Sequence, residues 1–294
     1  MIPTISLKSG QEIPKIALGI YMIGGGMKRD QNNDDSGQIK MLKYSIDSGI
    51  THIRTAQNYA SGHCEELIGQ AISGYDRNKL FITVAVNENF GIDEQSLVNE
   101  LTGSLKRLKT EYVDLYLIGG INPGVSLKKI ANGLSKVKEL GLAKDIGISN
   151  YRMNEFEYLN TLLDGQIVYN ELQYNLIIRE PDLDGMKEYL NEKGIVLGAY
   201  RALQQGQLSK PGIIILDRLA EKYHKTPSQI ALKWLLKDSH VVPIVKSSSK
   251  THIDEIATIF DWEMEKSDIN QLSIDFPIQI KKGDCMPPTN YLTK

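Results

Sequence analysis

Two side chains five residues apart, Arg54 and Tyr59, are the first candidates for chemistry in this chain of 294 residues. A phenol is a poor acid or base at neutral pH until a neighbouring cation stabilises its anion. Arg54 ends a short apolar run, so we expect its guanidinium at the inner end of a strand, close to the Tyr59 hydroxyl. A cation there is costly unless it is paired. It either pairs with an acid, for which Glu171 and Glu88 are candidates, or binds a carboxylate or phosphate of a ligand.

Other motif classes that carry chemistry are missing from the sequence. It has no GxSxG motif and no Cys/His set, so no motif indicates a covalent nucleophile. It has no His/Asp/Glu cluster with metal-ligand spacing, so no motif indicates a metal site. Gly24-Gly25-Gly26 lacks the GxGxxG spacing, and the acidic segment 30–35 that follows would repel a pyrophosphate, so we interpret it as a loop. His63 precedes a helix, where an exposed histidine is the expected outcome.

Composition indicates a soluble globular protein without a nucleic-acid partner. The formal net charge is −2, which argues against a broad basic face. The two cysteines, Cys64 and Cys285, form no CxxC pair, so we expect free thiols in a reducing cytoplasm rather than a disulfide framework. The first residues lack a signal-peptide pattern, and no apolar run approaches the roughly 18 residues of a membrane span.

Short apolar runs alternate with longer amphipathic stretches along the whole chain. The runs, rich in Ile, Val or Leu, suit parallel strands buried on both faces. We predict strands at residues 15–20, 51–54, 80–86, 113–118, 144–147, 167–170, 195–199 and 241–245. We predict helices at residues 36–48, 94–108, 127–140, 154–163, 182–193, 212–223 and 227–236.

The alternation favours one closed α/β barrel, a single (β/α)8 domain over residues 1–294, with an open doubly wound sheet as the alternative. Glycine stops at Gly49, Gly141 and Gly194 suit the short loops between helix and strand. A hairpin of residues 4–7 and 12–14 is expected to cover the bottom of the barrel. The active site of such a barrel lies at the carboxyl ends of its strands.

Five segments resemble the aldo-keto reductases, in order and over almost the whole chain. They are residues 49–59, 62–69, 112–118, 147–150 and 244–247. In that family a tyrosine donates a proton to the substrate carbonyl, a lysine paired with an aspartate tunes the tyrosine, a histidine orients the carbonyl, and NADPH delivers hydride. The resemblance places Tyr59 at the tyrosine position.

The other three catalytic positions of the family hold different residues here. Arg54 stands at the aspartate position, Ala85 at the lysine position and Gly119 at the histidine position. Arg54 is a candidate for the cation beside Tyr59, but nothing replaces the histidine. The resemblance therefore implies a degenerate site that is poor or inactive in standard carbonyl reduction.

The positions that bind the cofactor in the family hold more of the family's residues than the catalytic positions do. By resemblance, Tyr200 stacks on the nicotinamide and Ser149 and Asn150 hold its amide. Lys246 and Ser247 meet the 2′-phosphate of NADP(H). The last of these positions, Glu255, meets the adenine.

Four cofactor positions depart from the family pattern. Glu171 replaces glutamine and cannot donate the amide hydrogen bond, Arg201 replaces serine, and Ile256 replaces asparagine. His252 replaces arginine and is a weaker phosphate partner. The resemblance implies NADP(H) binding with reduced affinity.

Three functions remain open at this point. The chain is an NADP(H)-dependent oxidoreductase with an atypical proton donor, a non-redox enzyme for elimination or isomerisation of a small anionic substrate, or a silent protein (a pseudoenzyme) that binds the nucleotide or a partner. Fold analogy alone does not choose among them.

Overall fold

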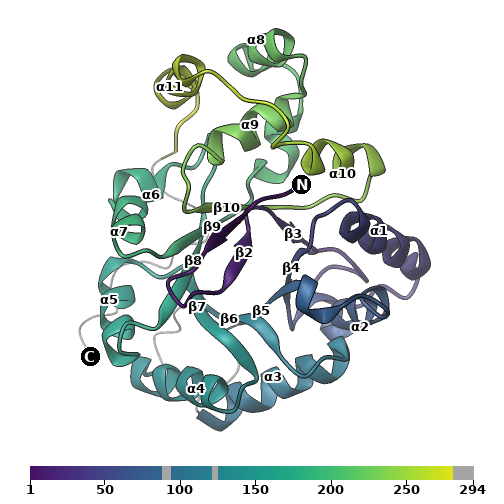
Figure 1. The fold of residues 1–294 in the computed structure, drawn as a ribbon, viewed down its shortest axis with the longest axis vertical. Helices are drawn as coiled ribbons and strands as arrows, with labels where there is room; N and C mark the ends of the chain where they lie inside the picture. The colour runs from purple at the N-terminus through teal and green to yellow at the C-terminus, as the bar shows by residue number, and fades with distance from the viewer. Residues whose placement is uncertain (88–93, 121–124, 281–294) are drawn as a thin grey trace.

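Eight parallel strands close into a barrel in the computed structural model, which describes residues 1–87, 94–120 and 125–280 (Figure 1). The strand order around the barrel is β10-β3-β4-β5-β6-β7-β8-β9. This confirms the (β/α)8 prediction and excludes the open sheet. The strands are β3 (Ala17–Gly19), β4 (His52–Ala56), β5 (Phe81–Asn87), β6 (Val113–Gly119), β7 (Ala143–Ser149), β8 (Ile167–Gln173), β9 (Val196–Tyr200) and β10 (Val241–Val245).

Helices surround the strands on the outside of the barrel (Figure 1). One of the predicted helices was wrong. Residues 182–193 do not form one helix, because Gly185 adopts a φ of 81° and divides the segment into α6 and α7. The helices are α1 (Asp35–Asp47), α2 (His63–Ala71), α3 (Glu94–Leu108), α4 (Leu127–Glu139), α5 (Met153–Leu162), α6 (Glu180–Leu183), α7 (Met186–Glu192), α8 (Ile214–Tyr223), α9 (Pro227–Leu235), α10 (Lys250–Ala257) and α11 (Lys266–Asp275), with short 3-10 helices at Tyr59–Gly62, Arg77–Lys79 and Gln204–Ser209.

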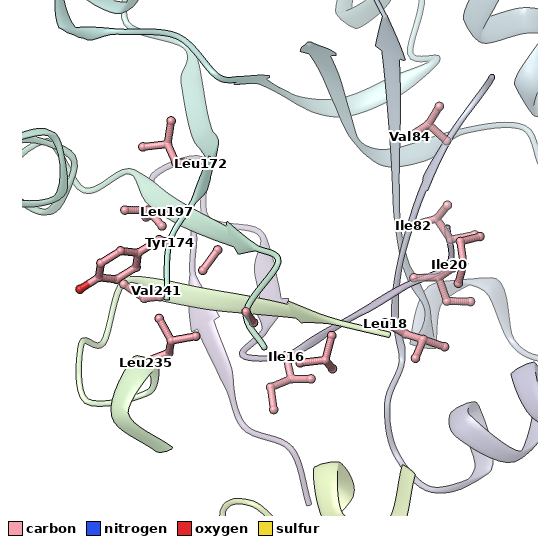
Figure 2. Close-up of a cluster of buried hydrophobic side chains, with 14 of the residues drawn as sticks. Ile16, Leu18, Ile20, Ile82, Val84, Leu172, Tyr174, Leu197, Leu235 and Val241 are labelled. Atoms are coloured by element: carbon pink, nitrogen blue, oxygen red, sulfur yellow. The ribbon is translucent and has the colours of Figure 1, made fainter. Parts of the chain in front are cut away.

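The strands have two apolar faces, as expected for a parallel sheet buried on both sides. Alternate side chains point into the barrel, where Ala17, Phe81 and Leu115 belong to a small inner cluster. The intervening side chains belong to the larger cluster that also contains residues of the surrounding helices. Figure 2 shows part of this larger cluster, including Leu18 and Ile82. The alternation orients every second residue at the strand ends toward the barrel axis.

An N-terminal hairpin closes the bottom of the barrel, as predicted. Strand β1 (Thr4–Ser6) pairs antiparallel with β2 (Glu12–Pro14), and Leu7 and Ile13 are buried in the inner cluster. The turn between the strands is tied to the barrel because the Ser9 hydroxyl donates to Asp145 at 2.6 Å. The bottom is therefore plugged, and the open end lies at the carboxyl ends of the strands.

A tyrosine fills the middle of the barrel and depends on a facing glycine. Tyr169 of β8 is fully buried, and a Cβ built on Gly198 of β9 would lie 2.0 Å from the Tyr169 Oη atom. That distance is far below any van der Waals contact, and the ring carbons lie almost as close. Gly198 is therefore required by close packing of side chains at this level of the barrel.

We expect Gly198→Ala to lower the free energy of unfolding by about 1–3 kcal/mol, the usual cost of overpacking a core. Gly103 of α3 is the matched control, since its added Cβ would meet only the flexible Arg107 guanidinium, at 3.3 Å. Gly103→Ala should leave stability unchanged or raise it by up to about 1 kcal/mol, because alanine favours helix. Urea denaturation measures both, and equal midpoints for the two variants would contradict the packing argument.

Some expectations are settled only in part. Among the described residues, no helix combines the length and the apolar character needed to cross a bilayer. Cys64 is a buried free thiol, whereas Cys285 lies outside the described residues. The predicted single domain of residues 1–294 includes 281–294, which also lie outside them, as does Glu88, the second proposed partner of Arg54.

Candidate active site

Arg54 and Glu171 form an ion pair across the inside of the barrel. Arg54 lies on β4 and Glu171 on β8, which are separated by three strands on either side. The guanidinium donates from Nε to Glu171 Oε2 at 2.9 Å and from Nη2 to Oε1 at 2.6 Å. The side chains are only 11% and 3% exposed. The pair is therefore bidentate and shielded from water, the geometry in which arginine binds a carboxylate most strongly.

The same guanidinium also reaches the candidate proton donor. Arg54 Nη1 donates to the Tyr59 hydroxyl oxygen at 2.8 Å, which confirms the predicted proximity. Tyr59 begins the 3-10 helix Tyr59–Gly62 directly after β4, and the Tyr21 ring packs edge-on against its ring at 5.2 Å. Within the described part of the chain, we find no hydrogen bond donated by the Tyr59 O–H group. Its proton is available to a ligand.

The charge on Arg54 is permanent. Burial alone would lower the pKa of the guanidinium, but the negative charge of Glu171, together with Tyr59, outweighs burial and raises it above the ordinary value. Arg54 thus differs from a lysine, which shifts its pKa readily when buried. It is a fixed cation beside the Tyr59 oxygen, and three of its N–H groups are already engaged.

The two other replaced positions leave space rather than new chemistry. Ala85 is 5% exposed and belongs to the inner cluster, against which Tyr59 packs. Gly119 ends β6, and a Cβ built on it would meet only the Val86 carbonyl oxygen, at 3.4 Å. No side chain at position 119 points toward the Tyr59 hydroxyl, so no donor there can hold a carbonyl oxygen.

The positions expected to hold a nicotinamide lie together at the ends of β7, β8 and β9. The Tyr200 hydroxyl donates to Asn150 Oδ1 at 2.9 Å, and the Ser149 hydroxyl lies 3.5 Å from Glu171 Oε1. Glu171, where the family pattern has glutamine, is turned toward Arg54. Ser149, Asn150 and Tyr200 therefore remain as candidates for cofactor contacts, directly beside the Arg54–Glu171 pair.

The positions expected to hold the adenosine end are divided. Lys246 and Ser247 line a cleft of about 730 Å³. His252 is exposed and does not line this cleft. The Glu255 carboxylate accepts from Thr226 Oγ1 at 3.3 Å, at the start of α9. Arg201, half-buried after β9, has a φ of 53°.

His63 was wrongly expected to be exposed. It is 7% exposed, because both ring nitrogens lie 2.7 Å from carboxylates, Nδ1 from Glu66 and Nε2 from Asp35. Asp35, the last residue of the acidic segment 30–35, therefore contacts α2, while Asp30, Gln31, Asn32 and Asp34 are exposed. The three residues tie the start of α1 to the first turn of α2.

Sequence reasoning missed Tyr21 and two lysines of α1. Tyr21 follows β3 at the open end of the barrel, so the rule that strand ends form the site could have found it. Lys40 and Lys43 line the cleft beside Lys246. On the sequence they are indistinguishable from the solvated face of an amphipathic helix. In the described ranges, no group of three or more His, Cys, Asp or Glu residues has the arrangement of a metal site.

Comparisons with known proteins agree with this fold. The model of the aldo/keto reductase family matches residues 15–274. Glyoxal reductase of Bacillus subtilis is 33% identical over 92% of this chain and 91% of its own length. The crystal structure of the thermostable aldo-keto reductase Tm1743, solved with the inhibitor epalrestat, is 34% identical with a TM-score of 0.88, covering 92% of this chain and 99% of that one.

A Bombyx mori aldo-keto reductase solved with NADP is 27% identical with a TM-score of 0.78, over 92% of each chain. The family match extends from just before β3 to the end of α11 and so includes the whole barrel. This chain belongs to the aldo/keto reductase family.

Proposed function

We propose that this chain is an NADP(H)-binding oxidoreductase that reduces ordinary carbonyl compounds poorly, with Tyr59 as its proton donor. The observation that carries the proposal is the hydrogen bond from Arg54 Nη1 to the Tyr59 oxygen, held in place by the bidentate pair with Glu171. It supports a proton-donor unit that differs from that of the family. The cation, Arg54, lies on β4, and its counter-ion, Glu171, lies on β8.

The cofactor part of the proposal rests on relatives and on residues that fit. A Bombyx mori relative was solved with NADP, and a Bacillus subtilis relative is named glyoxal reductase. In this chain Tyr200 is half-buried with Asn150 beside it, and Lys246 is an exposed cation on a cleft. When bound, NADPH would supply hydride for transfer to a carbonyl carbon.

The residues of the chain would manage the proton. Tyr59 would donate its O–H proton to the substrate oxygen, and Arg54 would stabilise the phenolate left behind through charge and an existing hydrogen bond. Because Glu171 fixes the guanidinium at two points, Arg54 needs no rearrangement as the charge develops. Solvent would return the proton to Tyr59, since the permanently charged Arg54 cannot serve as a relay.

The proposal of slow turnover rests on Gly119. A donor that stabilises a developing oxyanion contributes on the order of 10²–10³ in kcat, and position 119 offers none. This absence favours the second candidate function, a silent NADP(H)-binding protein. An anionic substrate held by Arg54 has little support, because Glu171 already neutralises its charge and three of its five N–H groups are engaged by Glu171 and Tyr59. A small uncharged carbonyl compound in the cytoplasm fits the site better.

Calorimetric titration with NADPH, followed by an absorbance assay of NADPH consumption with nitrobenzaldehyde, tests the two halves separately. We expect NADPH to bind and turnover to stay below about 1 s⁻¹, the lower end of ordinary enzyme rates. Tyr59→Phe should reduce the residual rate by about 10²–10⁴, the usual worth of acid catalysis, and leave the Kd of NADPH unchanged.

Each outcome has one meaning. Absence of NADPH binding contradicts the cofactor assignment, and turnover above about 1 s⁻¹ contradicts the claim that the site is poor. A residual rate that Tyr59→Phe leaves intact removes Tyr59 as proton donor. Binding with no detectable turnover at all selects the silent protein.

A further inference from the structure

A wide cleft lies outside the barrel mouth, between α1 and the loop that joins β10 to α10. Its volume is about 730 Å³. Helix α1 forms one wall and the loop with Lys246 and Ser247 forms the other, while Leu18 and Ile23 lie at the end next to β3. In the barrel, β10 and β3 are hydrogen-bonded neighbours, so the cleft adjoins the open end where Tyr59 lies.

Cations dominate the lining of this cleft. Four lysines line it, Lys40 and Lys43 from α1 and Lys246 and Lys250 from the other wall, against two acids, Asp34 and Asp47. Both acids are engaged elsewhere. Asp34 caps α1 by accepting from Gly37 N, and Asp47 accepts from the Tyr75 hydroxyl at 2.7 Å. Among the described residues, none of the four lysines has an ion-pair partner.

Contacts between the two helices fix the width of the cleft. The Tyr44 hydroxyl of α1 donates to Asp254 of α10 at 2.7 Å, and the Lys250 ammonium lies 5.0 Å from the centre of the Tyr44 ring. Figure 1 shows α1 and α10 as neighbours at the edge of the barrel. The N-cap residue of α10, Ser249, makes no side-chain capping bond, so the first N–H groups of this eight-residue helix lack that partner. Uncapped N–H groups and lysines together suit an anion.

We propose that Lys40 and Lys43 bind the phosphate group that distinguishes NADPH from NADH, across the cleft from Lys246 and Ser247. The proposal rests on the proposed function and adds the residues that set its cofactor preference. The position where the family resemblance implies an arginine holds His252, which is exposed and outside the cleft lining. Lys40 and Lys43 replace the missing positive charge from the opposite wall.

The double variant Lys40→Ala/Lys43→Ala tests this assignment, with the Kd values of NADPH and NADH measured by calorimetry. We expect the Kd of NADPH to rise roughly 10-fold, as for loss of a charge-assisted contact, while that of NADH changes less than about twofold. Lys128→Ala/Lys129→Ala on α4 is the control, because it removes the same charge from an exposed helix elsewhere. Lys40→Arg/Lys43→Arg should retain the preference.

Adenosine 2′-monophosphate is a second probe, and it separates this inference from the proposed function. If the wild type binds neither NADPH nor NADH, the proposed function fails, and loss of binding of the monophosphate in the double variant still supports the phosphate site. If the double variant keeps the wild-type preference for NADPH, the lysine assignment is overturned and the proposed function stands. An equal weakening of NADPH and NADH, or the same effect in the α4 control, also overturns it.

Discussion

Gly119→His should raise the kcat of this protein for a simple aldehyde by about 10²–10³, the range by which a single donor to a developing oxyanion accelerates acyl-transfer enzymes. The substitution supplies an N–H donor at the end of β6, where the family resemblance places a histidine. The Arg54–Tyr59 unit already has a cation and a free O–H group, so the missing donor is the largest deficit.

The structure allows this substitution. Gly119 does not have a positive φ, and an added Cβ would meet only the Val86 carbonyl oxygen, at 3.4 Å, an ordinary contact. In β6, Leu115 and Leu117 belong to the inner cluster, and the two-residue repeat of a strand points position 119 to the same side. A histidine side chain would therefore extend into the mouth of the barrel near Tyr59.

Gly119→Leu is the matched control, since leucine has comparable bulk and no N–H group. Steady-state kinetics with NADPH and nitrobenzaldehyde should show the gain for histidine and none for leucine. Combining Gly119→His with Tyr59→Phe should remove the gain, because the two groups act on one oxygen. A folded, NADPH-binding Gly119→His variant with the wild-type rate would contradict the role assigned to this position.

The barrel could be predicted because its signal is local. Each strand is a short run rich in Ile, Val or Leu, and stops such as Gly49 and Gly141, whose φ values are 92° and 69°, act within a few residues. The break at Gly185 was not predicted, since an isolated glycine is also tolerated inside a helix. The strand that carries Arg54 likewise needed only the local pattern, although it continues to Ala56, beyond the predicted end at Arg54.

The sequence reduced the candidate acids that pair with Arg54 to Glu171 and Glu88 but did not decide between them. Glu171 lies 117 residues away, on the far side of the barrel, and which inward side chains meet there depends on the stagger of the strands. The prediction that His63 is exposed was wrong for a related reason. Its burial depends on Asp35, 28 residues earlier, in a segment that was interpreted only as a loop.

The cleft lysines illustrate a different limit. Lys40 and Lys43 lie three residues apart on α1, a spacing that most often marks the solvent face of an amphipathic helix. Only the approach of the loop with Lys246, some 200 residues later, makes them part of a common cationic cleft. Sequence reveals the charge on each element, whereas their convergence depends on how the barrel closes.

Restoring the family residue, glutamine, at position 171 should destabilise this protein. Glu171→Gln is nearly isosteric, yet we expect it to lower the free energy of unfolding by about 3–5 kcal/mol, the cost of leaving one partner of a buried ion pair uncompensated. Arg54 would keep its charge inside the barrel, at 11% exposure, with a neutral amide in place of a carboxylate. Guanidinium denaturation, fitted with a two-state model, measures the loss.

The double variant Arg54→Met/Glu171→Gln distinguishes an ion pair from ordinary packing. Because both charges are removed, its stability should return to within about 1–2 kcal/mol of the wild type, and the two substitutions should be strongly non-additive. Simple additivity would contradict the pairing as the source of the loss. The same reasoning applies to Ala85→Lys, which introduces a second cation into the inner cluster and should be tolerated only together with Arg54→Asp and Glu171→Gln. Positions 54, 85 and 171 therefore constrain one another. A single substitution toward the family residue at one of them should destabilise the protein, whereas the combined substitution at all three should be tolerated.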